Sequence, residues 1–224
     1  MATLALISLL GIAAAWLVYP AGIGLVAILR RRRQTAAAQP DAFVSVVLAT
    51  RESMASIRAR VANCLESDHA AAFLEVVIAL DRAAEPGEQN ALMEGFERVV
   101  VARSAGRGKA AALNAGVEAA HGDSIVFADT YQRFDRQTIP RLIARLAEDG
   151  VGAVSGNLVL PGGRSPIVRN YWRYERWLRE TEARVHSSVG VTGAVYAIRK
   201  ELWRPLPAGL ILDDVYVPMR IVLD

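Results

Sequence analysis

Residues 43–50 read FVSVVLAT, a short run that is apolar at nearly every position and rich in β-branched side chains. Three later stretches have the same character: LEVVIALD (74–81), RVVVARS (98–104) and DSIVFAD (123–129). Strands without a polar face are typical of parallel sheets that are covered on both sides. Segments of helical character lie between them, around 54–66, 88–96 and 109–120. With right-handed crossovers, this order predicts a three-layer α/β/α sandwich with a mostly parallel sheet.

Polar side chains close three of these strands. Thr50, Asp81 and Asp129 each stand where a strand is expected to end. In open α/β sheets, ligands bind beyond the carboxyl ends of the strands. We therefore expect these three side chains to face one crevice.

The N-terminal segment predicts a membrane anchor. Residues 1–29 contain no charged side chain, and about 20 apolar residues are enough to cross a bilayer as a helix. A cleaved signal peptide, the alternative, would carry its positive charge before a shorter apolar stretch, whereas here four arginines follow at 30–33. Because Lys and Arg beside a span favour the cytoplasmic side, these arginines place the rest of the chain in the cytosol.

Composition narrows the possible functions. The chain has 224 residues, 53% of them hydrophobic, which is enough for one sizeable core plus an extra element. Of the 26 basic residues, 22 remain once the arginines at 30–33 are set aside, and they face 23 acidic residues, which argues against a nucleic-acid-binding surface. Cys64 is the only cysteine, so an intrachain disulfide and a zinc cluster of several thiolates are excluded. The three histidines show no metal-ligand spacing.

A basic turn precedes the third helical segment. GRGKAAALNAG, residues 106–116, places Arg107 and Lys109 among glycines and ahead of an alanine-rich helix. A phosphate could bind there on backbone N–H groups and the ammonium group. The turn is not a P-loop, because Ala110 stands where Ser or Thr would meet magnesium. A solvated turn that caps a helix is the alternative.

Two adjacent carboxylates, Asp213 and Asp214, begin the last helical segment. Carboxylates are favourable at a helix start, so capping alone can explain them. The functional interpretation is a general base that removes a proton from an acceptor hydroxyl.

The segment IVRNYWRYERWLRETEARV, residues 167–185, spaces its aromatic residues as a helix does. Tyr171, Tyr174 and Leu178 fall on one face, and Trp177 lies beside it. We expect a packed or membrane-facing helix here, in preference to a surface that stacks on sugars.

Taken in order, these pieces resemble the inverting family 2 glycosyltransferases with the GT-A fold, in particular the membrane-bound branch near the cellulose and hyaluronan synthases. The most specific match is GRGKAAALNAG, which is similar to the family's Gly-Lys-x-x-Ala-Leu-Asn segment. The resemblance divides the chain into an anchor with a basic flank (1–33), a linker (34–42) and a catalytic domain (43–224).

The resemblance also implies roles for individual residues. By position in the family's motifs, Thr50, Glu52 and Asp81 match its contacts to the nucleotide base, and Lys109, with Arg107 beside it, comes near the donor diphosphate. GVTGAVYAIRK (190–200) resembles the acceptor loop, which here contains Thr192 and Gly193. LDDVYVPMRI (212–221) resembles the Glu-Asp motif, so that Asp214 matches the catalytic base and Asp213 takes the place of the glutamate.

Two features depart from the family. IVFADTY (125–131) resembles the segment of the Asp-x-Asp motif that binds Mg²⁺ or Mn²⁺, but Tyr131 replaces its second acid. One carboxylate with phosphate oxygens and water can still complete an octahedral shell, so we expect Asp129 to bind the metal or, alternatively, the donor sugar. The chain also stops at Asp224, before the family's Gln-x-x-Arg-Trp motif and the further spans of the synthases, which predicts a fragment or a truncated product.

The function that the resemblance predicts is a membrane-anchored, cytosol-facing transferase that moves a sugar from a UDP-sugar to a hydroxyl of a glycan or a lipid. A donor-binding scaffold subunit without activity is one rival, favoured by Tyr131 and the short C-terminus. A sugar nucleotidyltransferase is the other, but it needs a Gly-rich basic loop after the first strand, where this chain has ATRESMAS (49–56).

Overall fold

The structure is a computed structural model of the 224-residue chain, and its described residues are 1–29, 42–83, 87–104, 106–159 and 165–224. The chain divides into two compact units, one made of residues 1–34 and 159–189 and the other of residues 35–158 and 190–224. The arginines at 30–33 and nearly all of the predicted linker lie outside the described residues. The predicted domain boundaries therefore stay a prediction.

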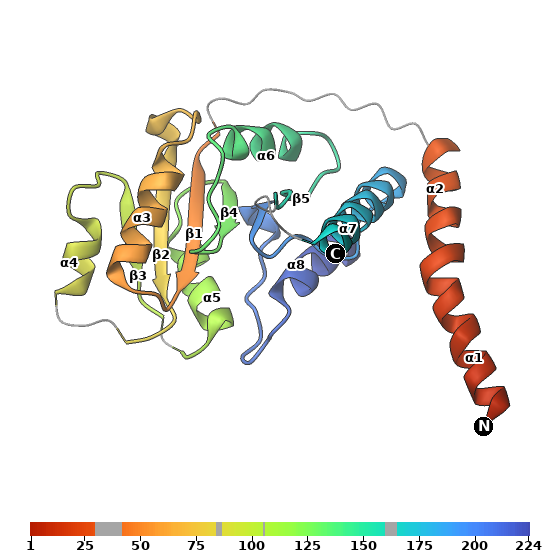
Figure 1. Ribbon diagram of the computed structural model, residues 1–224. Coiled ribbons are helices and arrows are strands. Elements are labelled where there is room, and N and C mark those ends of the chain that lie inside the picture. Colours follow the sequence, from red (N-terminus) through yellow and green to blue (C-terminus); the bar gives the residue numbers. More distant parts are fainter. Residues whose placement is uncertain (30–41, 84–86, 105, 160–164) are drawn as a thin grey trace. The chain divides into compact units, whose positions relative to one another are not determined.

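A six-stranded sheet with the order β3-β2-β1-β4-β6-β5 forms the centre of the larger unit (Figure 1). The four predicted strands are confirmed and run parallel: β1 (Val44–Thr50), β2 (Leu74–Leu80), β3 (Val99–Ala102) and β4 (Ser124–Ala128). Two further strands are antiparallel to their neighbours: β6 (Val195–Arg199) pairs with β4 and with β5 (Ala153–Ser155). In the register, Val44 lies opposite both Leu74 and Ser124, so β1, β2 and β4 end at one edge.

Helices cover both faces of this sheet, which confirms the three-layer prediction. One face packs against α3 (Met54–Leu65), α4 (Glu88–Met93) and α6 (Thr138–Leu146), and the other against α5 (Lys109–Ala119) and α8 (Asp213–Leu223). Successive residues of β1 serve opposite faces, because side chains alternate along a strand. Leu48 belongs to the same buried cluster as Ile57 of α3, whereas Val47 packs with Leu113 of α5.

The close approach of α5 to the sheet depends on Gly116. A Cβ atom at this position would lie 2.6 Å from the Val47 Cγ1 atom, which no side chain could tolerate without a shift of the helix. This part of α5 therefore lies close to β1 and β2. Lys109 begins the same helix, about two turns before Gly116.

The smaller unit consists of the N-terminal helix and α7. The helices α1 (Ala2–Ala13) and α2 (Tyr19–Leu29) are joined by a π-helical stretch, Ala14–Val18. Of this run, Thr3–Leu29 is long and apolar enough to cross a membrane, with a mean hydropathy of 2.1. The predicted aromatic helix is α7 (Pro166–Val185), which starts at a Ser165 cap and packs against α2.

Candidate active site

Thr50 and Asp81 lie together at the edge where β1 and β2 end. The backbone N–H of Asp81 donates to the Thr50 carbonyl at 2.8 Å, and the hydroxyl of Thr130 donates to that of Thr50, also at 2.8 Å. The Thr50 hydroxyl in turn accepts from the N–H of Glu52 at 3.1 Å. Residues that follow β1, β2 and β4 are thus connected, as expected for a single crevice.

Asp81 forms an ion pair with Arg51, a residue that the sequence analysis did not select. The Arg51 guanidinium lies 2.7 Å from the Asp81 carboxylate, and the Asp81 side chain is only 7% exposed whereas that of Arg51 is 71% exposed. A ligand that contacts Asp81 must therefore share it with this arginine or displace it. An exposed arginine one residue after a strand carries no distinctive sequence signal.

Tyr131, at the position expected from the resemblance to hold a second acid, bonds to Glu52. A hydrogen bond to the Glu52 carboxylate raises the pKa of the Tyr131 phenol, which is 74% exposed. Glu52 was predicted to contact the base, and the structure brings it to Tyr131 at the mouth of the site. Tyr131 therefore adds no negative charge beside Asp129.

Lys109 and Asp213 form the central ion pair of the site. The Lys109 ammonium nitrogen lies 2.9 Å from the Asp213 carboxylate, which is buried at the first turn of α8. Arg107 is exposed in the turn before α5. Two sequence motifs about 100 residues apart thus meet, since α5 and α8 cover the same face of the sheet.

Asp129 is electrostatically coupled to this pair. Partial burial raises the pKa of its carboxyl group, and the negative charges of Asp213 and Asp214 act in the same direction. The positive charges of Lys109 and Arg60 oppose this shift. The site therefore gathers three carboxylates around one lysine, although no three His, Cys, Asp or Glu side chains in the described part of the chain form a ready metal cluster.

The predicted acceptor loop lies against Asp214. A Cβ atom on Gly193 would come within 2.8 Å of the Asp214 Oδ2 atom, so a larger residue here would require the Asp214 carboxylate to move. The Val191 N–H donates to the Asp214 carbonyl at 2.9 Å. Thr192 is buried, and its N–H donates to the Ser155 hydroxyl at 2.8 Å, which fixes the loop on β5. Gly193 is thus brought to the site, and Thr192 holds the loop.

Arg60, which the sequence analysis also missed, fixes the segment that carries Asp129. Its Nε donates to the Asp129 carbonyl at 2.8 Å, and its guanidinium lies 3.9 Å from the centre of the Phe134 ring. Its Nη1 donates to the Asn63 side chain, which bonds both the N–H and the carbonyl of Phe134. The one feature that could have pointed to this contact is that two polar residues, Arg60 and Asn63, occupy buried positions of α3.

Tyr196 of β6 lies beneath the acidic residues. Its ring stacks on Phe127 at 4.5 Å, and its hydroxyl is buried without a hydrogen-bond partner in the described part of the chain. Burial raises the pKa of this phenol well above its usual value, and the charges of Asp213, Asp214 and Asp129 add to the effect. Tyr196 therefore stays neutral beneath the carboxylates.

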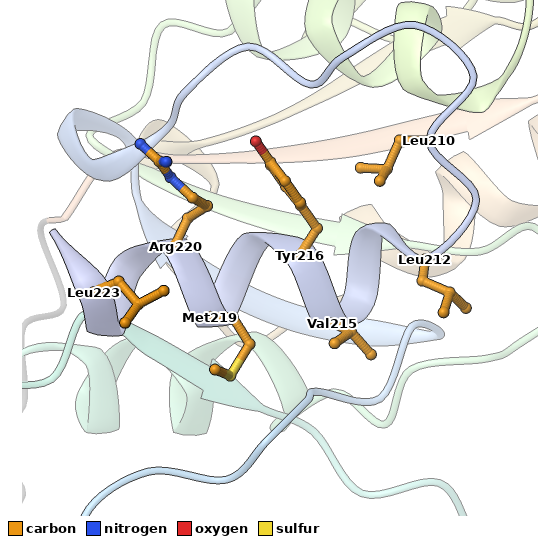
Figure 2. A pocket seen from close by; sticks show the side chains of 7 residues that line it. All are labelled: Leu210, Leu212, Val215, Tyr216, Met219, Arg220 and Leu223. Carbon is orange, nitrogen blue, oxygen red and sulfur yellow. The ribbon is translucent and has the colours of Figure 1, made fainter.

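An apolar groove of about 380 Å³ runs along α8, beginning beside the two aspartates. Figure 2 shows Val215 and Met219 pointing to one side of α8 and Tyr216 and Arg220 to the other. The groove is lined by Leu210, Leu212, Val215, Tyr216, Met219, Arg220 and Leu223. An apolar group could therefore lie within a few residues of Asp214.

The chain is similar in sequence to one protein family and in structure to two glycosyltransferases. The family model "Glycosyl transferase family 2" matches residues 45–201. A mannosyltransferase from Pyrobaculum calidifontis, solved with GDP-Man and Mn²⁺, is similar in structure with a TM-score of 0.75 and 23% identity, over 95% of this chain and 62% of that one. TarS (1–349) of S. aureus has a TM-score of 0.57 and 15% identity, over 80% of this chain and 55% of that one. No curated protein sequence matches the chain. At these identities the likeness shows a shared fold, the predicted GT-A fold.

The clamp formed by Arg60 predicts local rather than global effects. Replacement Arg60→Met removes a buried charge but leaves the Asp129 carbonyl without its donor, so we expect little net change in the free energy of unfolding. Amide exchange in residues 129–134 should become faster by roughly five-fold, as for the loss of one hydrogen bond worth about 1 kcal/mol. Arg58→Met is the matched control, because Arg58 clamps Ala91 and Glu94 instead. Equal effects of the two variants on residues 129–134 would contradict this role.

The raised pKa of Asp129 predicts a pH-dependent cost to stability. The folded chain holds its Asp129 proton to a higher pH than the unfolded chain, so ionisation destabilises the fold as the pH rises above the ordinary value of 3.8. The variant Asp129→Asn should therefore have a higher melting temperature than the parent at pH 7 to 8, and the difference should vanish toward about pH 3.5. A melting-temperature difference that does not change with pH would show that the carboxylate is not destabilised.

Proposed function

The chain belongs to glycosyltransferase family 2, and from this premise we propose that it transfers a sugar from a UDP-sugar to an acceptor hydroxyl with inversion at the anomeric carbon. We place it in the membrane-bound branch of the family, with a cytosolic catalytic domain and residues 1–33 as its anchor. One observation carries the proposal: Asp129, Lys109, Asp213 and Asp214, from three separate motifs, share one electrostatic site.

The donor diphosphate is assigned to the start of α5. Lys109 supplies an ammonium group, Arg107 a second positive charge, and the first turn of the helix free N–H groups. Lys109 is paired with Asp213. Phosphate oxygens would therefore compete with Asp213 for Lys109, and binding of the donor would loosen the contact between the two helix starts.

The nucleotide base is assigned to the edge formed by Thr50, Glu52 and Asp81. Asp81 is nearly buried and aligned by its backbone bond to Thr50, which suits a carboxylate that accepts hydrogen bonds from a base N–H group. Arg51 covers Asp81 and would move aside or stack on the base. The similar mannosyltransferase is described with GDP-Man, so guanine is the alternative to uracil here.

A divalent cation fits the site with Asp129 as its protein ligand. The three carboxylates exceed the two positive charges, Lys109 and Arg60, that act on Asp129, and this excess of negative charge favours a cation. Mg²⁺ is commonly held by one carboxylate with phosphate oxygens and water. The similar mannosyltransferase is described with Mn²⁺. When bound, the cation would offset the charge of the leaving diphosphate. Arg60 keeps the Asp129 backbone in place for this role.

The structure favours Asp214 over Asp213 as the base. Asp213 is buried and engaged by Lys109, whereas Asp214 is partly exposed and lies against Gly193 of the acceptor loop. Asp214 would take the proton of the acceptor hydroxyl as that oxygen attacks the anomeric carbon. The bond between the anomeric carbon and the diphosphate breaks, and its electron pair leaves with the nucleotide.

The two rival functions receive less support. A sugar nucleotidyltransferase would need a Gly-rich loop after β1, but here Ser53, the third residue after β1, already caps α3. A donor-binding scaffold would bind UDP but would neither transfer nor hydrolyse the sugar. Assays of sugar transfer and UDP-sugar hydrolysis therefore distinguish it from an enzyme.

The phosphate assignment predicts the effect of Lys109→Ala. Loss of a charge-assisted contact should weaken UDP binding by roughly 1.5 to 3 kcal/mol in calorimetry. The control is Lys200→Ala, because Lys200 is the only other lysine and follows the far end of β6, where it bonds to the Ala120 carbonyl. Unchanged UDP affinity in Lys109→Ala would refute the assignment, and GDP titrated in parallel tests the choice of base.

The base assignment predicts that Asp214→Asn abolishes transfer. In the full-length protein, kcat should fall about a hundred-fold or more, since a positioned base contributes at least that much, while UDP affinity stays nearly unaltered. Asp123→Asn, an exposed aspartate just before β4, is the control. Asn caps a helix about as well as Asp, so a capping role alone predicts near-normal turnover. UDP binding without sugar transfer or UDP-sugar hydrolysis in the parent would favour the scaffold.

A further inference from the structure

We propose that Tyr196 is a positioning residue of the site, whose hydroxyl replaces Lys109 as the partner of Asp213 when the donor diphosphate draws the lysine away. The exchange keeps the start of α8, and with it Asp214, in place during sugar transfer. The inference rests on the proposed function, because the diphosphate is what removes the lysine. No proton is transferred, since the phenol donates a hydrogen bond and keeps its hydrogen.

The first observation is that the Tyr196 hydroxyl has an unused hydrogen bond. The residue is fully buried, its ring stacks on Phe127, and its hydroxyl has no hydrogen-bond partner among the described residues. A phenylalanine would fill nearly the same space without the cost of a buried, unpaired hydroxyl. The tyrosine is therefore accounted for by a state of the site in which its hydroxyl does have a partner.

The second observation is that Tyr196 and Asp213 lie on the same side of the sheet. Val217, one turn after Asp213 on α8, is buried in the same cluster as Tyr196. Residues four apart share a face of a helix, so Asp213 projects toward the side of the sheet that Tyr196 occupies. Burial raises the pKa of the phenol most, and among the carboxylates Asp213 adds most to this shift. A carboxylate only accepts hydrogen bonds, so the phenol is the donor in this pair.

The third observation is that Lys109 and Asp213 differ in burial. Their charged atoms are 2.9 Å apart, but the Lys109 side chain is 42% exposed and that of Asp213 only 6%. The flexible lysine can follow an incoming phosphate, whereas Asp213 stays at the first turn of α8. A buried carboxylate that loses its cation is strongly destabilised unless another donor takes its place.

Tyr196 is the donor that suits this exchange. Three buried side-chain atoms lack a hydrogen-bond partner in the described part of the chain: Arg60 Nη2, Gln132 Oε1 and the Tyr196 hydroxyl. The glutamine atom is an acceptor, and Arg60 lies on α3, which covers the opposite face of the sheet from α8. The phenol is also neutral. It satisfies Asp213 without reducing the negative charge that favours a divalent cation in the site.

The first test needs no donor, because Lys109→Met imitates the departure of the ammonium group. In the full chain, solubilised in detergent, Tyr196→Phe should leave the melting temperature unchanged or raise it slightly, since it removes an unpaired hydroxyl. In the Lys109→Met background, the same change should lower the melting temperature by roughly 3 to 6 °C, as for the loss of one hydrogen bond to a charged group.

The control for this comparison is Tyr216→Phe, because Tyr216 of α8 packs against the same buried cluster. Its effect on the melting temperature should be the same with Lys109 and with Met at 109. If Tyr196→Phe also has equal effects in the two backgrounds, the inference is overturned. The hydroxyl would then act on a group other than Asp213, or on none.

The second test measures UDP affinity by calorimetry, and it applies even if Lys109→Met does not fold. Tyr196→Phe should weaken UDP binding by about ten-fold, because Asp213 without the phenol holds the lysine more firmly. In the Asp213→Asn background, which has no buried charge to compensate, the effect of Tyr196→Phe should largely vanish. Unchanged UDP affinity in Tyr196→Phe alone would refute the exchange. If the parent binds neither UDP nor GDP, the proposed function fails instead, and the melting temperatures decide whether Tyr196 can replace Lys109.

Discussion

The ion pair between Lys109 and Asp213 joins the two helix starts on which the candidate site is built. Further contacts hold the helix that carries Lys109 and the segment that leads to Asp213. α5 approaches the sheet closely at Gly116, and Asn114 of the same helix bonds both the N–H and the carbonyl of Leu206 in the segment that leads to α8. The asparagine of the Gly-Lys-x-x-Ala-Leu-Asn segment thus has a structural task. One short motif contains the lysine proposed to bind phosphate and also contacts the segment that leads to the helix with the proposed base.

Most of the central sheet could be predicted from the sequence, because its strands have no polar face and are separated by helices of ordinary length. The strand order beyond β4 could not. β6 pairs antiparallel with β4 across the long segment that contains α6, β5 and α7, and no local pattern specifies so distant a partner. The packing of α7 against the N-terminal helix could not be predicted either. An aromatic stripe indicates that a helix is packed, but it does not identify the element against which the helix packs.

The candidate site divides in a similar way. Its acidic and basic members were predictable, because a carboxylate after an apolar strand or at a helix start departs from the surrounding pattern. The residues that hold them in place were not. Arg51 covers Asp81 from a loop, Arg60 reaches the Asp129 carbonyl from α3, and both contacts depend on the relative position of elements that only the fold supplies. Gly193 was found through the family resemblance, but its reason, room for Asp214, is steric and three-dimensional.

The position of Tyr131 completes the electrostatic argument. Asp129 already has a raised pKa from burial and from two neighbouring carboxylates, and a further acid at 131 would raise it more. A neutral phenol bonded to Glu52 avoids that repulsion. It also leaves a cation with fewer protein ligands, so the phosphate oxygens of the donor must supply the rest. Under the proposed function, binding of the cation and binding of the diphosphate would be coupled, because each would provide the charge that the other needs in order to stay in the site.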